Sequence, residues 1–371
     1  MLIPVNRPLI SNEDITCVAQ TLKDTFISGD TLPIKLMEDK LSEILGISNV
    51  VAVNSGTSAI DLSVEALGIE EGYECVLPTF TIISTVTNLL RKKAFIRLVD
   101  SDINTWSINA ETAADVISNK TKLVLPVHIY GLPVDLKPIL ETANKFGVFV
   151  LEDAAEALGL KYQDQYCGTL GNAGIFSFYA NKIVTGGEGG AVVSSDNDFA
   201  QRIRYFRNLC FKQNERYVHT DLGWNYRLGG MNSALILSQL SRLEQLIIQK
   251  QKLAKVYLEN LKGHPWFDFH PEKTKYSKNL YWVFGILLNS ECPFDAKTLQ
   301  SKLRELSVDT RRFFCPIHLQ PFFRKFNFDL VGKMEVSERL WDRGLYLPSG
   351  LGNTHDEIAK VIEILWGLVK K

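Results

Sequence analysis

Short apolar runs alternate with stretches of helical periodicity through the first half of this 371-residue chain, and this alternation constrains the fold most strongly. The expected strands cover residues 50–53, 75–77, 95–99, 122–127 and 148–151, and the expected helices cover 57–67, 83–90, 110–117 and 136–146. Strands that alternate with helices of about ten residues form βαβ units with parallel strands. The sequence therefore predicts an α/β fold with a mostly parallel central sheet. Residues 175–193 add strands to it, and we expect one of them to be antiparallel.

The elements outside this region predict two domains. The expected helices cover 11–23, with a capping-box-like start at Ser11, 32–45, 296–306 and 355–368, and an expected strand covers 281–287. Apolar residues at helical spacing predict a long helical stretch over 232–261, which bridges the two domains. We therefore predict a large domain over residues 1–250 and a small C-terminal α+β domain over 251–371.

The overall composition excludes several classes of partner. The chain has 41 basic and 42 acidic residues and a net charge of −1, which is not typical of a nucleic-acid-binding or polybasic membrane-binding surface. Its six cysteines form no Cys-x-x-Cys pair and no spacing typical of a metal site. No signal peptide or membrane-spanning run is recognisable. We predict a cytoplasmic protein that binds no nucleic acid, membrane or metal ion.

A lysine beside a glycine cluster is the first candidate for chemistry. Lys182 follows the apolar run 175–179, and four glycines crowd into 186–190. Taken alone, this pattern is typical of a surface lysine before a hairpin. However, Asp153 ends an apolar strand 29 positions earlier, and strand ends are where α/β sheets bind ligands. A desolvated lysine that can form a Schiff base and a carboxylate for a ring nitrogen together fit pyridoxal phosphate.

The turn after the first strand is a candidate phosphate site. Gly56 allows a tight turn, and Thr57 and Ser58 open the next helix. Free N–H groups and the helix dipole at such a position favour a phosphate. An ordinary Ser/Thr N-cap is the alternative interpretation of the same residues.

These motifs, in this order, resemble those of the DegT/DnrJ/EryC1/StrS sugar aminotransferase family. The resemblance runs from about residue 3 to the C-terminus, and within the family it is strongest to the perosamine synthases. It implies the fold-type-I architecture of pyridoxal-phosphate enzymes, with helices on both faces of the sheet and a small C-terminal domain.

The resemblance also implies roles for individual residues. Lys182 would bond the cofactor aldehyde, and Asp153 would pair with the pyridine nitrogen. The other cofactor-binding residues would be Gly56, Thr57, Ser58 and Ser177 at the phosphate, Glu156 near the phenolic oxygen, and Asn225 at the phosphate of the neighbouring subunit. The substrate-binding residues would be His219, Arg311 and His318. The position of Asn225 implies a homodimer with shared active sites, although a polar loop is its ordinary alternative.

The implied reaction is transfer of an amino group, with L-glutamate as donor, to a nucleotide-linked 4-keto-6-deoxyhexose. The nucleotide, the sugar and the keto position stay open. One branch of the family has histidine in place of Lys182 and removes a hydroxyl group instead, so Lys182 favours transamination over this pyridoxal-phosphate dehydratase alternative. A non-catalytic regulatory protein on the same fold is a further alternative. A nicotinamide dehydrogenase is disfavoured because no Gly-x-Gly-x-x-Gly follows the first strand.

Two positions depart from the family pattern. Ile82 stands where the family has a tyrosine or tryptophan that stacks on the cofactor ring, so either Ile82 or a nearby aromatic such as Phe80 would cover the ring. Residues 228–230, Leu-Gly-Gly, follow the Asn-Tyr-Arg motif at 225–227 and are the second departure.

Overall fold

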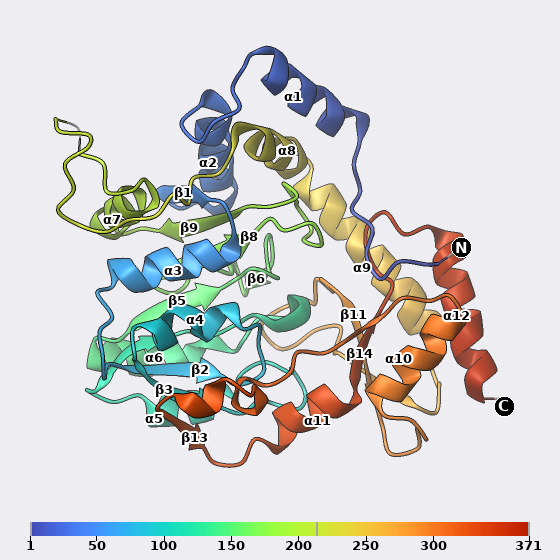
Figure 1. The fold of residues 1–371 in the computed structure, drawn as a ribbon. Helices are drawn as coiled ribbons and strands as arrows, with labels where there is room; N and C mark the ends of the chain where they lie inside the picture. Colours follow the sequence, from blue (N-terminus) through green and yellow to red (C-terminus); the bar gives the residue numbers. More distant parts are fainter. Residues whose placement is uncertain (1, 213, 370–371) are drawn as a thin grey trace.

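A computed structural model describes residues 2–212 and 214–369 of the chain. Within these residues, eight strands form the central sheet, in the order β1-β9-β8-β5-β4-β2-β3-β13 (Figure 1). The strands are β1 (Asn49–Val53), β2 (Glu74–Pro78), β3 (Phe95–Val99), β4 (Thr121–Val124), β5 (Phe149–Asp153), β8 (Ala173–Ser177), β9 (Gly190–Ser194) and β13 (Phe328–Val331). Among these eight, β9 alone runs opposite to the others, since it pairs antiparallel with β1 and β8. The predicted mostly parallel α/β sheet is confirmed.

Helices cover both faces of this sheet (Figure 1). They are α2 (Leu32–Leu45), α3 (Gly56–Ala66), α4 (Ser84–Arg91), α5 (Ala110–Val116), α6 (Leu136–Phe146), α7 (Asn197–Arg207) and α8 (Gly230–Leu240). In β1, Val51 and Val53 join the core beside α3 and α7, whereas Val50 and Ala52 join the core beside α2 and α8. Side chains of a strand alternate between faces, so a strand covered on both faces needs a continuous apolar run.

The small sheet lies in the C-terminal part of the chain. Its order is β10-β11-β14-β12, with bounds β10 (Phe267–Phe269), β11 (Phe284–Leu288), β12 (Arg311–Arg312) and β14 (Gly344–Leu347). The nearby helices are α9 (Leu243–Asn260), α10 (Ala296–Glu305), α11 (Glu335–Arg343) and α12 (His355–Val369). Helices α9, α10 and α12 share one apolar core with this antiparallel sheet. No helix among the described residues has the length and apolar character needed to cross a membrane.

The edge strand β13 connects the late part of the chain to the large sheet. It pairs in parallel with β3, and Arg97 on β3 donates to Asp329 on β13 at 3.1 Å. The sequence analysis did not foresee this strand, because a four-residue edge strand carries little periodic signal. Residues 328–331 fall inside the predicted small domain, and the domain boundary at residue 250 stays a prediction. The remaining short elements are β6 (Lys161–Tyr162), β7 (Gln165–Tyr166), and the 3-10 turns η1 (Ile129–Gly131), η2 (Ile317–Leu319) and η3 (Phe323–Lys325).

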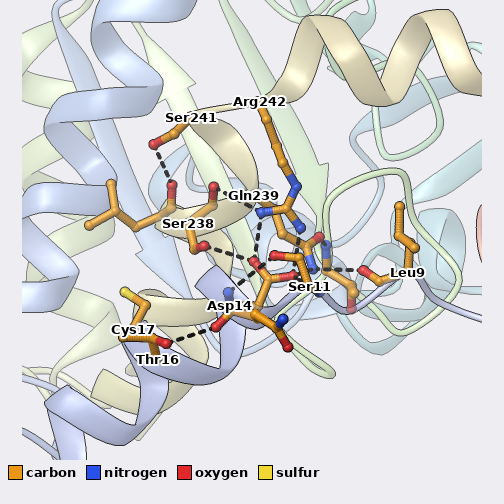
Figure 2. Close-up of polar contacts among 12 residues, drawn as sticks. Leu9, Ser11, Asp14, Thr16, Cys17, Ser238, Gln239, Ser241 and Arg242 are labelled. Atoms are coloured by element: carbon orange, nitrogen blue, oxygen red, sulfur yellow. Dashed lines mark hydrogen bonds and ion pairs between the residues drawn. The ribbon is translucent and has the colours of Figure 1, made fainter.

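The helical stretch expected over 232–261 is present, but it is divided at Ser241–Arg242 into α8 and α9. A buried charge cluster occupies the break. Arg242 donates to both carboxylate oxygens of Asp14, at 2.8 and 2.6 Å, and the Asp14 side chain is fully buried (Figure 2). Asp14 lies in the first turn of α1 (Asn12–Lys23) and also completes the predicted capping box with Ser11.

Candidate active site

A cavity of about 310 Å³ lies at the carboxyl ends of the large-sheet strands. Asp153 ends β5, Ser177 ends β8, and both line this cavity. The small sheet contributes Arg311 on β12 and Tyr346 on β14, which are paired neighbours. The cavity therefore lies where both sheets meet, at the edge at which parallel sheets bind ligands.

The start of α3 forms one wall of the cavity. Gly56 and Thr57 line it, and Ser55 caps the helix by accepting a hydrogen bond from the Ser58 N–H at 3.0 Å. A Cβ on Gly56 would lie 3.0 Å from the Cβ of Ser177, so glycine lets this turn approach β8 closely. The Ser58 hydroxyl donates to Asn54 Oδ1 at 2.5 Å, and Ser58 is not among the residues that line the cavity.

Lys182 enters the cavity beside two carboxylates. Its Nζ lies 3.6 Å from Glu156 Oε1, and the two side chains are only 11% and 7% exposed. Burial lowers the pKa of Lys182, and the charges of Glu156 and Asp153 oppose this shift. Burial also raises the pKa of Asp153, and it raises the pKa of Glu156 to about 7, against the effect of Lys182. A lysine in such a place exchanges its proton far more readily than one in water.

Hydrogen bonds hold the two carboxylates in place. Glu156 Oε2 accepts from the backbone N–H of Tyr130 at 2.8 Å, and Asp153 Oδ1 accepts from the N–H of Ala155 at 3.0 Å. Glu156 is therefore a buried group of the cavity wall.

The residues present fit pyridoxal phosphate. The free N–H groups of the first turn of α3, with the Gly56 cradle and Ser177, suit a phosphate. The Thr81 hydroxyl is buried in the cavity wall and has no hydrogen-bond partner among the described residues, which leaves a polar atom for a ligand. Asp153 offers a carboxylate for a ring nitrogen, and Lys182 offers an amine for an aldehyde.

An apolar side chain lines the cavity at the first departure from the family pattern. Ile82 borders the cavity and is 41% exposed. Phe80 is fully buried and packs against Tyr130, Phe313 and Phe314 instead. Of the two candidates, only Ile82 is therefore in a position to cover a cofactor ring bound in the cavity.

Only one of the three predicted substrate residues reaches this cavity. Arg311 lines it. His318 lies outside, where its Nδ1 is 2.7 Å from Thr79 Oγ1 and its Nε2 is 3.1 Å from Glu338. His219 lies on an exposed segment, with Nδ1 2.8 Å from the carbonyl oxygen of Leu209.

Asn225 also lies outside the cavity of its own chain. It forms a β-bridge with Asn208, at the base of the segment that joins α7 to α8 and projects from the body (Figure 1). Tyr217 and Leu222 on that segment are 80% and 89% exposed. The predicted role of Asn225 therefore depends on a second copy of the chain.

Trp282 is a cavity residue that the sequence analysis missed. Its ring lies 3.8 Å from Lys182 Nζ, measured to the ring centroid. It stands in an apolar run that predicts only a buried strand, and β11 begins two residues later, at Phe284. No local signal distinguishes this tryptophan from an ordinary core residue.

Comparisons with known proteins extend these observations. The sequence matches the model of the DegT/DnrJ/EryC1/StrS aminotransferase family over residues 8–366. The chain is 33% identical over 361 residues to a GDP-perosamine synthase of Escherichia coli O157:H7, with 97% of each chain covered. It is similar to the aminotransferase TlmJ of Streptoalloteichus hindustanus, with a TM-score of 0.91, 25% identity and coverage of 100% of this chain and 99% of that one.

A third protein shares the fold. It is an Escherichia coli GDP-4-keto-6-deoxy-D-mannose-3-dehydratase with bound hydrated pyridoxal phosphate, with a TM-score of 0.91, 22% identity and coverage of 98% of this chain and 100% of that one. The predicted fold type, enzyme class and cofactor are confirmed by these similarities. With the family model matched over nearly its whole length, this chain belongs to the DegT/DnrJ/EryC1/StrS aminotransferase family.

Proposed function

We propose that this chain transfers an amino group from L-glutamate to a GDP-linked 4-keto-6-deoxymannose, which yields GDP-perosamine. The observation that carries the proposal is Lys182, a buried amine 3.6 Å from Glu156 in the cavity at the sheet edge. The sugar and the nucleotide are taken from the printed names of the perosamine synthases to which the chain is similar.

The residues of the cavity would have different roles in this reaction. Bound pyridoxal phosphate supplies an electron sink that allows a proton to leave the carbon bearing the amino group. Lys182 would hold the cofactor through its amine and, once released, carry this proton. Asp153 would keep the ring nitrogen protonated, and Gly56, Thr57 and Ser177 would bind the phosphate. Arg311 would bind an anionic group of a substrate, because a guanidinium presents a planar fork of donors.

Glu156 complements Lys182 in this scheme. Its raised pKa, about 7, lies in the range in which a carboxyl group gains and loses protons near neutral pH. A carboxyl group so placed would exchange a proton with the amine of Lys182 and so return this amine to its starting protonation state between turnovers.

The active enzyme is a homodimer in this proposal. Asn225 lies on a projecting segment outside its own cavity, and it would reach the cofactor phosphate of the second subunit. His219, on the same segment, would approach the substrate bound there. We also propose that the protein acts in the cytoplasm, which its six free cysteines suit.

Product analysis tests the reaction. Purified protein loaded with pyridoxal phosphate is given L-glutamate and GDP-4-keto-6-deoxymannose, and mass spectrometry follows the sugar nucleotide. We expect a 4-amino product, and we expect the dTDP- and UDP-linked 4-keto-6-deoxyhexoses to react at least about 100-fold more slowly.

Other outcomes identify the rivals. A product that has lost a hydroxyl group without gaining an amine would establish a dehydratase. Bound cofactor without turnover of any keto-sugar would establish a non-catalytic protein. Equal turnover of all three nucleotides would refute the assignment to GDP while leaving the aminotransferase reaction intact.

A further inference from the structure

The indole ring of Trp282 lies against the amine of Lys182. The distance from Lys182 Nζ to the ring centroid is 3.8 Å, and Trp282 is 4% exposed. An ammonium group over an indole face is attracted by the ring quadrupole, and more strongly where water is excluded. The same nitrogen lies 3.6 Å from Glu156 Oε1. The amine is therefore contacted by both a π face and a carboxylate.

Two further contacts fix the orientation of this ring. The indole N–H of Trp282 donates to the carbonyl oxygen of Asn181 at 3.0 Å, and Asn181 directly precedes Lys182. The ring also stacks on Tyr130, with centroids 6.1 Å apart and planes 28° apart. The N–H of Tyr130 in turn donates to Glu156. Trp282, Lys182 and Glu156 thus form one connected unit.

The backbone places Trp282 by close packing against η1. The N–H of Leu280 donates to the carbonyl oxygen of Gly131 at 2.8 Å. Gly131 has φ +96°, and a Cβ on it would lie 2.6 Å from the backbone nitrogen of Trp282. A side chain at this position would force the two segments apart, so glycine is needed for Trp282 to reach Lys182.

Titratable groups line the two cavities that this unit borders. Around the main cavity they are Asp153 at the end of β5, Glu156 just after it, Glu188 in the glycine-rich turn, Arg311 on β12 and the neutral phenol of Tyr346 on β14. Arg7 and Lys250 line a second cavity of about 20 Å³ that Lys182 and Trp282 also border. The carboxylates attract the amine of Lys182, and the cations repel it when it is charged. Trp282 carries no charge, but the π face of its indole ring favours the ammonium form of Lys182.

We propose that Trp282 is a positioning residue for Lys182: its indole face holds the free ammonium beside Glu156 whenever the amine is not bonded to the cofactor. The inference rests on the proposed function, because the amine becomes free only when an amino donor takes its place. A lysine on its flexible four-carbon stem would otherwise sample many rotamers. Held against the ring, the amine stays where it can take up and return a proton.

The test measures the protonation of Lys182 in the cofactor-free protein. The protein is acetylated with acetic anhydride at a series of pH values. Mass spectrometry of the peptide that contains Lys182 gives the acetylation rate at each pH, and hence the midpoint of the pH–rate profile. We expect Trp282→Leu to lower this midpoint by about one pH unit, because the ammonium loses its π contact. Trp282→Phe keeps a weaker π face, so its midpoint should fall between those of the unsubstituted protein and Trp282→Leu. The midpoint does not depend on how easily the reagent enters the cavity.

A second tryptophan supplies the matched control. Trp341 makes a similar contact with Arg312, at 3.6 Å, away from Lys182. Trp341→Leu should leave the Lys182 midpoint unchanged. If Trp282 only excluded water, Trp282→Leu would raise the midpoint, since hydration favours the charged amine. A raised or unchanged midpoint would therefore overturn the inference.

Two measures keep the result decisive. If Trp282→Leu does not fold, the comparison of Trp282→Phe with the unsubstituted protein decides alone, through the same downward shift or its absence. Borohydride reduction of the loaded protein then identifies the lysine that carries the cofactor. A cofactor on another lysine would refute the proposed function and this inference together. A cofactor on Lys182 with coinciding midpoints would refute only the role of Trp282.

Discussion

At the scale of single residues, the environment of Lys182 differs from that of an ordinary surface lysine. The side chain is 11% exposed and is contacted by Glu156 and Trp282. Burial lowers the pKa of the amine, and the charges of Glu156 and Asp153 oppose this shift. Chemistry at this site therefore depends on a balance among three side chains from different parts of the chain.

Replacement of Lys182 tests this balance directly. In Lys182→Ala we expect no covalent attachment of pyridoxal phosphate, and a rate of amino transfer at least about 100-fold lower, because the group that carries the proton is lost. Borohydride reduction followed by peptide mapping and a coupled glutamate assay measure both. Lys250→Met is the control, since Lys250 is a second buried lysine and borders the same small cavity. Loss of attachment in that control instead would show that the cofactor lysine has been assigned wrongly.

At the scale of elements, the buried ion pair between Asp14 and Arg242 joins α1 to the break between α8 and α9. Asp14 on α1 receives hydrogen bonds from Arg242, Ser238 and the backbone N–H of Ser11 (Figure 2). The side-chain amide of Gln239 also donates to Asp14, at 3.3 Å. Its Oε1 accepts from the backbone N–H of Thr185, three residues after Lys182. The cluster thus joins α1, the α8–α9 break and the turn that carries the lysine.

The cluster predicts a large loss of stability on removal of its carboxylate. Asp14→Ala leaves Arg242 without its partner in a mostly buried place, and we expect the free energy of unfolding to fall by about 3 kcal/mol. Urea unfolding measures this loss. Glu13→Ala removes an exposed carboxylate from the same helical turn, and its cost should stay below about 1 kcal/mol. Equal losses in the two variants would contradict the special position of Asp14.

At the scale of the whole molecule, a buried lysine joins α9 to the segment that follows β14 of the small sheet. Lys250 on α9 is 4% exposed and donates to the carbonyl oxygen of Ser349, just after β14. Burial lowers its pKa to about 7. In the unfolded chain a lysine titrates near pH 10.4, so between about pH 7 and 10 the unfolded state binds more protons than the folded state.

Stability should therefore rise with pH through this junction. From pH 7 to 9 we expect Lys250 to add up to about 1.4 kcal/mol per pH unit to the free energy of unfolding. The measurement is urea unfolding at pH 7, 8 and 9, with the difference taken between the unsubstituted protein and Lys250→Met. Lys255→Met, at an exposed lysine of the same helix, should show no such difference. A flat difference for Lys250→Met would mean that Lys250 stays charged in the folded protein.

The assembly of two molecules makes a separate prediction. If Asn225 completes the site of the partner, mixing Lys182→Ala with Asn225→Ala subunits restores one intact site in each heterodimer. We expect purified heterodimers to show about half of the activity of the unsubstituted dimer, while either variant alone is nearly inactive. Differently tagged subunits allow the heterodimer to be isolated. Isolated heterodimers without restored activity would show that each subunit holds a complete site.

The sequence by itself determined how strands and helices alternate in the first half of the chain, because burial on both faces of a parallel sheet requires local apolar runs. The pattern of strand ends and glycine turns also pointed to Lys182, Asp153 and Gly56, which line one cavity in the structure. The Leu-Gly-Gly departure at 228–230 proved to be a packing feature, as a Cβ on Gly230 would overlap the carbonyl oxygen of Phe26.

Only the tertiary structure decided the rest. The contact of Trp282 with Lys182 spans 100 positions, and the Asp14–Arg242 pair that occupies the helix break spans 228. The edge strand β13, the placement of His318 away from the cavity and the choice of Ile82 over Phe80 likewise depend on which distant surfaces pack together. Local periodicity carries no information about such partners, because their free energy is gained only when segments far apart in the chain meet.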